Sequence, residues 1–409
     1  MPDDSDLVRV RFDSDLSFTS ATFERTISPS GCSTASTESC YSPRLAAVLR
    51  RPLEIRWSDD IRQMYSIRKL VAPPVERGVQ LRYARQRSSG RALVAKIRSK
   101  RVCFSSQEEE QRWRATTIDV LNVLPGSGFG AVVDVIEDPH HYYVMMECVA
   151  GVDLLEAVGD GRALSAEATR SVMRQLLAAL SELHARGCIH RDLKLENLMI
   201  DRPGDSPSMK PVACPGGSRA RERRRSSSTT LTVVDLDTVV RFQPDTPSSE
   251  VLGTNMYLAP ESYAGSYSPA GDIFAAGVVA YRLLTSRFPF SEEMFDDVGV
   301  GDNVVGHPKM REVQLKLLSS KVDWNHDVFR REPEARRLLR SMLALNSAKR
   351  PSAYEALLHP WFTAAGGDPF DPKVSLISEN GTSCLKDERG FRVFLRDLLG
   401  CAASAICFR

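Results

Sequence analysis

The sequence predicts an α+β protein with two lobes, a small antiparallel β-sheet lobe followed by a mainly helical lobe. Residues from about 62 to 147 contain short runs of apolar and β-branched side chains that are typical of strands. After Gly151 the apolar residues recur at helical spacing, and this character continues to Phe362. A strand-rich part followed by a helix-rich part is typical of the α+β class.

Composition and charge are those of an ordinary globular protein. Hydrophobic residues make up 42% of the 409 residues, and 54 basic against 52 acidic side chains give a net charge of +2. This balance does not favour a nucleic-acid partner. The nine cysteines lack metal-ligand spacing, the first residues lack a secretion signal, and no apolar run has membrane-spanning length. We therefore expect an intracellular protein, in the cytoplasm or the nucleus, without a transmembrane segment.

The first 149 residues divide into an extension and the sheet lobe. Residues 1–60 are rich in Ser, Thr, Asp and Arg without sustained periodicity, which predicts disorder. In the sheet lobe, residues 61–149, a helix is expected over about 106–124, because three glutamates stand in its first turn, where the helix dipole favours them. The strands of this lobe are expected to begin near residue 64 and to cover 79–84, 91–97, 131–136 and 142–147.

The helical lobe is expected over residues 150–362. Its clearest helix is 165–186, which opens with Ser-Ala-Glu-Ala and carries leucines at helical spacing. An insertion rich in Pro, Gly, Arg and Ser, 203–230, lies between two short strand-like runs. The tail, 363–409, ends in an apolar segment with basic residues, which is a candidate regulatory helix for a calmodulin-like partner. Packing of this helix on the helical lobe is the alternative.

One short segment carries the chemistry. It reads IHRDLKLEN over residues 189–197 and is followed, after an apolar run, by Asp235. Phosphoryl transfer needs a carboxylate that accepts the proton of the attacking hydroxyl, and oxygen ligands that hold magnesium against nucleotide phosphates. Asp192 supplies the carboxylate, and Lys194 neutralises charge on the transferred group. Asn197 and Asp235 supply the metal ligands.

Further motifs follow in a fixed order along the chain. LVAK ends at Lys96, MMECVAG covers 145–151, GTNMYLAPE covers 253–261, and HPWF covers 359–362. Together with the catalytic segment they resemble the protein kinase family, and within it the calcium/calmodulin-dependent group, over about residues 62–362. The resemblance implies the two-lobed kinase fold and transfer of the γ-phosphate of ATP, with Mg²⁺ or Mn²⁺ as the metal.

The resemblance also assigns the nucleotide site. Lys96 would grip the phosphates, Met146 would be the gatekeeper, and the backbone of Glu147 and Val149 would bond the adenine edge. The implied nucleotide-binding set is Val79, Val94, Lys96, Met146, Glu147, Val149, Asp153 and Asp235.

A substrate class follows from the same resemblance. Lys194 and Thr254 match the serine/threonine pattern, so protein serines and threonines are the expected acceptors. Glu196 and Asp153 match acidic positions that bind an arginine upstream of the acceptor, although solvated surface charges are the alternative.

The resemblance also implies one regulatory contact and two structural contacts. Arg191 is expected to pair with a phosphate that an upstream kinase places on the activation segment, at Thr246, Ser248 or Ser249. Two supporting contacts complete the resemblance, a pair between Glu261 and Arg350 and a bracing role of Asp272 on the catalytic loop.

The phosphate-binding loop departs from the family pattern. Residues 72–78 read APPVERG where the family has a glycine-rich loop. Pro74 has no N–H to offer, and Glu76 would repel the phosphates, with Arg77 as a partial compensation. In addition, Val94 replaces a small residue and narrows the adenine pocket.

Two further departures concern the partners of Lys96 and the metal. Helical phase places Thr117 where the family has the glutamate that pairs with Lys96, and Glu110 or Asp119 would substitute only if the helix shifts. Asp237 replaces the glycine of the metal-binding triplet, and a second carboxylate there would alter metal preference. The sequence thus predicts a basophilic serine/threonine kinase of weak or conditional activity. A pseudokinase scaffold without catalysis is the alternative.

Overall fold

The computed structural model describes residues 52–74, 76–159, 161, 163–201, 229–295, 299 and 301–363. The predictions for residues 1–51, for most of the insertion and for the tail beyond residue 363 lie outside the described residues. They stay predictions.

The first lobe is built on a six-stranded sheet in the order β1-β5-β6-β4-β3-β2. Every neighbouring pair from β5 to β2 in this order is antiparallel, as predicted. The five expected strands are present close to their predicted bounds, as β2 (Tyr65–Leu70), β3 (Val79–Gln86), β4 (Ala92–Ser99), β5 (Val132–Glu137) and β6 (His141–Glu147).

The sixth strand, β1 (Ile55–Trp57), corrects the prediction that residues 1–60 are disordered throughout. It pairs in parallel with β5, from Ile55 opposite Val135 to Trp57 opposite Glu137. Arg56 forms an ion pair with Asp134, whose carboxylate also accepts a hydrogen bond of 2.8 Å from the Tyr65 hydroxyl. Three residues are too short a run to show a period of two, so only these contacts made across the sheet reveal the strand.

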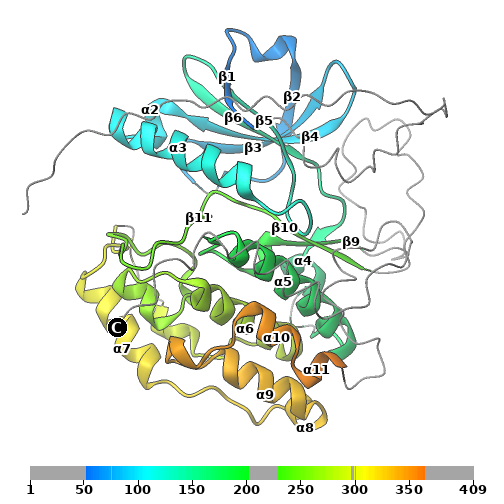
Figure 1. The fold of residues 1–409 in the computed structure, drawn as a ribbon, viewed down its shortest axis with the longest axis vertical. Helices are drawn as coiled ribbons and strands as arrows, with labels where there is room; N and C mark the ends of the chain where they lie inside the picture. The colour runs from blue at the N-terminus through cyan, green and yellow to red at the C-terminus, as the bar shows by residue number, and fades with distance from the viewer. Residues whose placement is uncertain are drawn as a thin grey trace, which may run out of the picture. The chain divides into compact units, whose positions relative to one another are not determined.

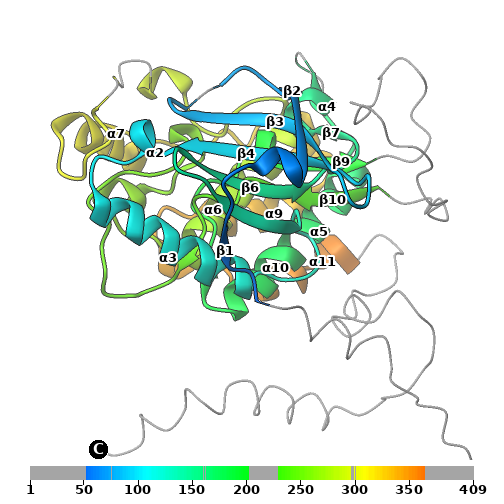
Figure 2. The ribbon, with the colours of Figure 1, turned by 90° about the horizontal axis from the view of Figure 1, so that it is seen from above.

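Helix α3 (Gln107–Val123) confirms the predicted helix. Ser106 caps its first turn by accepting a hydrogen bond from the backbone N–H of Glu109. The short helix α2 (Lys100–Cys103) leads into it from the end of β4. Figures 1 and 2 both show α3 running beside the sheet.

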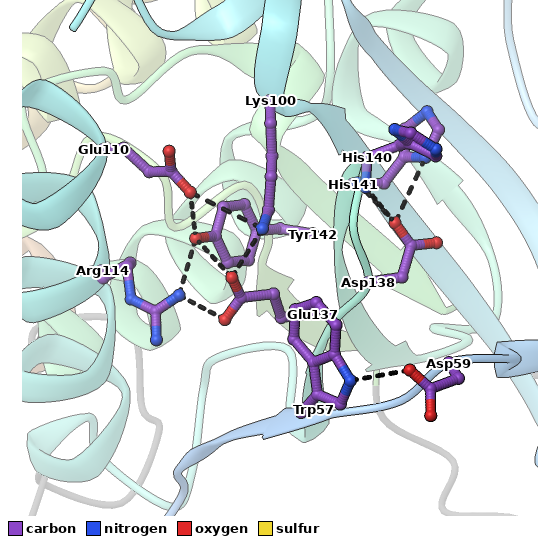
Figure 3. A network of polar contacts seen from close by, with 10 residues as sticks. All are labelled: Trp57, Asp59, Lys100, Glu110, Arg114, Glu137, Asp138, His140, His141 and Tyr142. Atoms are coloured by element: carbon purple, nitrogen blue, oxygen red, sulfur yellow. Dashed lines mark hydrogen bonds and ion pairs between the residues drawn. The ribbon is translucent and has the colours of Figure 1, made fainter. Parts of the chain in front are cut away.

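A network of polar contacts fixes α3 to the sheet around the Tyr142 hydroxyl (Figure 3). This hydroxyl donates to Glu110 of α3 at 2.5 Å and accepts from Arg114 of α3 at 2.7 Å. Arg114 also pairs with Glu137 of β5, which lies 2.6 Å from the Lys100 Nζ. Because Tyr142 is fully buried, these contacts are shielded from water and hold the helix against β5 and β6.

Replacing Tyr142 by phenylalanine should lower the free energy of unfolding by about 1–3 kcal/mol. The substitution keeps the ring but leaves Glu110 and Arg114 without their shared hydroxyl partner. Chemical denaturation measures the change, and Tyr354→Phe is the matched control, because Tyr354 is 39% exposed. Equal stability of the Tyr142→Phe variant and the wild type would show that the network adds nothing.

The second lobe is helical and lies below the sheet in Figure 1, with β9, β10 and β11 between the two. Its core surrounds α5 and α6, whose buried residues belong to one hydrophobic cluster. Helix α5 confirms the helix predicted over 165–186, with Ser165 as its N-cap. The helices are α4 (Leu154–Val158), α5 (Ala166–Ala185), α6 (Pro269–Thr285), α7 (Pro308–Ser319), α8 (Asp327–Arg331), α9 (Pro333–Met342), α10 (Ala353–Leu357) and α11 (Pro360–Thr363).

Short strands frame the region between the lobes. β7 (Val152–Asp153), β9 (Leu198–Asp201) and β10 (Thr230–Val233) form one small sheet, and β8 (Cys188–Ile189) pairs with β11 (Val240–Arg241). β9 and β10 are the strand-like runs expected on either side of the insertion, and Thr230, predicted as its last residue, is the first residue of β10. The two-lobed α+β fold is therefore confirmed. Within the described ranges, no helix has the length and apolar character needed to span a membrane.

Candidate active site

The loop after β8 is held by a single buried carboxylate. Asp272, in the first turn of α6, accepts hydrogen bonds from the backbone N–H of His190 at 2.8 Å and of Arg191 at 2.9 Å. It also lies 2.9 Å from His184 Nε2. Arg191 has a φ of 72°, a left-handed conformation that is unfavourable for a residue other than glycine. The bonds to Asp272 stabilise this conformation, which turns the chain so that the next residue, Asp192, enters the site.

Asp192 lies in a cluster of three polar side chains. The Lys194 Nζ is 2.8 Å from Asp192 Oδ2, and the Thr254 hydroxyl donates to Asp192 Oδ1 at 2.8 Å. Lys194 in turn donates to the Thr254 hydroxyl at 3.0 Å. The structure thus brings two predicted catalytic residues together and adds Thr254, which the sequence had suggested only as part of an acceptor-class pattern.

Asn197 and Asp235, the predicted metal ligands, come from neighbouring elements. The Asn197 amide Nδ2 donates to the backbone oxygen of Asp192 at 2.9 Å, and the backbone oxygen of Asn197 accepts from the N–H of Val234. Because Nδ2 is the atom bonded to Asp192, the amide oxygen is the Asn197 atom that would bind a metal. One amide oxygen and one carboxylate fit Mg²⁺, which prefers few protein ligands and completes its shell with phosphate oxygens and water.

Lys96 does not pair with α3. Its Nζ lies 2.7 Å from Asp235 Oδ1 and 2.7 Å from Asp237 Oδ2. Burial alone would lower the pKa of Lys96, but attraction to Asp237, and then to Asp235, raises that pKa above its ordinary value. The same lysine keeps the pKa of Asp235 below its ordinary value despite the burial of that carboxylate.

The suggested substitutes on α3 are wrong. Glu110 is bound to Tyr142, and Asp119 pairs with Arg241 of β11 through two hydrogen bonds of 2.8 and 3.0 Å. Helical phase had shown which side of α3 faces the sheet, but it could not show that these carboxylates have partners elsewhere.

The structure adds a partner for Glu76. Glu76 pairs with Arg98 of β4 at 3.2 Å, so Arg98 offsets part of its charge, and the compensation expected from Arg77 stays a prediction. Gly78 follows with a φ of 83°, and a Cβ there would lie 2.7 Å from Val102. The loop is therefore fixed between β4 and α2 by Arg98 and by this close approach at Gly78.

The predicted adenine-binding positions lie on the adjoining strands. Val79 begins β3, and Val94 of β4 lies opposite Met146 of β6. Glu147 ends β6, and its backbone N–H donates to the oxygen of Ala131 at 2.8 Å. That N–H is therefore occupied, so the predicted contact of the Glu147 backbone with an adenine edge would fall to its carbonyl. The contact of Val149, which follows β6, stays a prediction.

Comparisons with known proteins agree with this geometry. Residues 80–362 match the protein kinase domain model. The chain belongs to the protein kinase family. It is 26% identical over 256 residues to sperm motility kinase Z of Mus musculus, covering 61% of this chain and 43% of that protein. It is also 26% identical over 364 residues to calcium-dependent protein kinase 2 of Oryza sativa subsp. japonica, covering 87% of this chain and 61% of that protein.

A third relative is serine/threonine-protein kinase RAD53 of Saccharomyces cerevisiae, 27% identical over 278 residues, covering 68% of this chain and 30% of that protein. The chain thus spans less than two thirds of the length of each of these three relatives. The calcium-dependent protein kinase among them agrees with the predicted resemblance to the calcium/calmodulin-dependent group.

In this kinase the activation segment already contacts Arg191. The Arg191 Nε donates to the backbone oxygen of Thr238 at 2.7 Å, and its guanidinium lies 5.6 Å from the centroid of the Tyr267 ring. Burial lowers the pKa of Arg191. The candidate phosphosite Ser248 bonds instead to Glu250. Pairing of Arg191 with a phosphate therefore stays a prediction.

Gly151 joins the hinge of the kinase to β7 at a point of close approach. Its φ is 98°, and a Cβ on it would lie 1.9 Å from the backbone oxygen of Ile200. Gly151→Ala should therefore lower the free energy of unfolding by about 1–3 kcal/mol or more, because strain adds to the steric conflict. Thermal and chemical denaturation measure the change. Gly126→Ala is the control, since nothing lies within 4 Å of a Cβ there, and similar losses in both variants would contradict the argument.

Proposed function

We propose that this protein is an active serine/threonine kinase that transfers the γ-phosphate of ATP to hydroxyls of protein substrates. The observation that carries the proposal is the Asp192, Lys194 and Thr254 cluster. A carboxylate held at 2.8 Å by both a lysine and a threonine hydroxyl is oriented to accept the proton of an incoming hydroxyl. Lys194 is placed to neutralise charge that develops on the transferred group.

Mg²⁺ would be held by Asn197 and Asp235, where it screens the charge of the nucleotide phosphates. Lys96 of β4 is the cation that pairs with Asp235. The altered loop at 72–78 is one of the departures from other kinases, beside Thr117 on α3 and Asp237. Because Arg98 offsets the charge of Glu76, that loop does not by itself exclude phosphate binding.

The test is transfer of labelled γ-phosphate to casein and to an arginine-rich peptide, with Mg²⁺ and separately with Mn²⁺. An Asp192→Asn variant prepared in parallel excludes a contaminating kinase. Transfer that is absent from this variant supports the proposal. Transfer no greater than that of the variant, with either metal and after treatment with an upstream kinase, would favour the pseudokinase scaffold.

A preference for arginine upstream of the acceptor is part of the proposal. Glu196 is exposed beside the catalytic loop, and Asp153 and Glu156 line an open pocket of about 580 Å³ at α4. Glu196 and Glu156 are exposed and Asp153 is half-buried, and carboxylates at these places suit a guanidinium. Asp153 also caps α4 by accepting from the N–H of Glu156 at 2.7 Å, so Glu196 is the better residue to test.

For specificity, peptides with arginine or alanine upstream of one serine should be compared. In the wild type the arginine peptide should have the lower KM, and Glu196→Gln should narrow that difference. Glu167→Gln, an exposed change on α5, is the control. An upstream activating kinase and a calmodulin-like partner of the tail belong to the same proposal, and the candidate segment for the partner lies outside the described residues.

A further inference from the structure

The position of Lys96 needs an explanation, because the helix that normally supplies its partner supplies none. In active kinases the lysine of this strand and a glutamate of the neighbouring helix must both be in place. Here α3 carries Thr117 at the corresponding helical phase, and its carboxylates at Glu110 and Asp119 are bound to Tyr142 and Arg241. Lys96 is nevertheless largely buried, with 13% of its side chain exposed, so it requires an anionic partner.

We propose that Asp237 is the residue that positions Lys96 for the nucleotide phosphates, replacing the missing carboxylate of α3. This inference rests on the proposed function. Asp237 stands two residues after Asp235, where other kinases have glycine. Its Oδ2 lies 2.7 Å from the Lys96 Nζ.

Asp237 is itself held by a second cation. The same Oδ2 atom lies 2.7 Å from Arg98 Nη2, so one carboxylate oxygen bridges Lys96 and Arg98. The two cations are two residues apart on β4 and therefore point to the same face of the sheet. Asp237 is 28% exposed and Arg98 12% exposed, which keeps this bridge partly shielded from solvent.

Arg98 also connects the bridge to α3 and to the altered loop. Its guanidinium lies 5.6 Å from the centroid of the Trp113 ring on α3, and its other nitrogen pairs with Glu76. A cation stacked on an aromatic ring is attracted to it. The connection between β4 and α3, made in other kinases by a carboxylate of the helix, is here made by Arg98 over Trp113, and Asp237 binds the same guanidinium.

Asp235 alone cannot keep Lys96 in position. As a metal ligand it must share its carboxylate with Mg²⁺, which weakens its attraction for the lysine. Asp237 already uses Oδ2 for two cations, so it is less suited to bind a metal. A lysine partner that is independent of the metal keeps Lys96 in place whether or not the metal is bound.

The first experiment measures nucleotide binding and transfer for Asp237→Asn. We expect the affinity for ATP to fall by about 10- to 100-fold, in EDTA as well as with Mg²⁺, because a charge-assisted contact to Lys96 is lost. In the double variant with Lys96→Met, the Asp237 change should add no further loss, since both act through one contact. Full additivity of the two changes would overturn the proposal.

A second pair of variants tests positioning rather than stability. Asp237→Gly with Thr117→Glu restores the arrangement of other kinases, and should recover ATP affinity and kcat/KM relative to Asp237→Gly alone. Thr116→Glu in place of Thr117→Glu is the matched control, because it adds the same charge at the neighbouring, exposed position of α3. Recovery with Thr116→Glu to the same extent, or no recovery with Thr117→Glu, would contradict the positioning role.

The outcomes separate this inference from the proposed function. A wild-type chain that binds ATP without transferring phosphate would remove the proposed function, while the EDTA binding measurements would still decide the role of Asp237. A loss confined to Mg²⁺, with a changed preference for Mn²⁺, would instead make Asp237 a metal ligand and overturn the inference. A wild-type chain that binds no nucleotide would overturn both.

Discussion

Replacing Asp192 by asparagine should lower kcat by about 10²–10⁴-fold, because a positioned general base contributes roughly that much to a proton transfer. Asparagine has nearly the same shape and can keep hydrogen bonds to Lys194 and Thr254, but it cannot accept the substrate proton. The affinity for ATP should stay close to that of the wild type, since the contacts of Asp192 are to side chains of the catalytic loop and activation segment.

Single-turnover transfer measures the first quantity, and binding of a fluorescent ATP analogue measures the second. Asp201→Asn, an exposed change at the end of β9, controls for the loss of one negative charge. The assignment of Asp192 as the base would fail if its variant kept the wild-type kcat. It would also fail if ATP affinity fell by as much as kcat, because that pattern indicates a misfolded site.

Replacing Arg350 by methionine should lower the free energy of unfolding by about 3–5 kcal/mol, the usual cost of breaking a buried ion pair on one side. The Arg350 side chain is fully buried and forms two hydrogen bonds, of 2.5 and 2.9 Å, with the carboxylate of Glu261. It also donates to the backbone oxygen of Ala344 at 2.7 Å and of Ala270 at 3.0 Å. A further bond of 3.3 Å goes to the backbone oxygen of Leu345, so the loss of Arg350 leaves Glu261 and three backbone oxygens without this partner.

Urea denaturation with an independent spectroscopic probe measures this effect. Arg330→Met is the control, because Arg330 pairs with Asp327 at the surface, with 73% of its side chain exposed, and its loss should cost less than about 1 kcal/mol. In the double variant Glu261→Gln with Arg350→Met, the free energy of unfolding should fall by less than the sum of the losses of the two single variants. Similar losses for Arg350→Met and Arg330→Met would show that the buried pair is not a main support of the helical lobe.

Local sequence patterns were sufficient to predict most of the helices and strands. Helices α3 and α5 have serine N-caps and acidic first turns that can be read directly from the sequence, and the five strands of β2 to β6 have apolar runs separated by turn residues. In contrast, β1 has three residues, and its pairing depends on Arg56 meeting Asp134, almost eighty positions later in the chain. Such a strand has no signal of its own in the sequence.

The catalytic loop could be predicted from the sequence in the same way, because its residues 190–197 are contiguous. Thr254 was not placed in the predicted catalytic set, since it reaches Asp192 from a segment sixty-two positions away. A hydroxyl beside a glycine in a loop has many ordinary explanations. Only the distance to Asp192 distinguishes this one.

The sequence by itself determined the family and the two lobes, and it predicted the catalytic and metal-binding side chains, because each of these is contained in short ordered motifs. Only the tertiary structure decided how Lys96 is neutralised. The candidates on α3, Glu110 and Asp119, each have another partner, and Asp237 reaches Lys96 from a segment far along the chain. Ion pairing depends on distance and burial in three dimensions, and neither quantity is encoded in the spacing of residues along one helix.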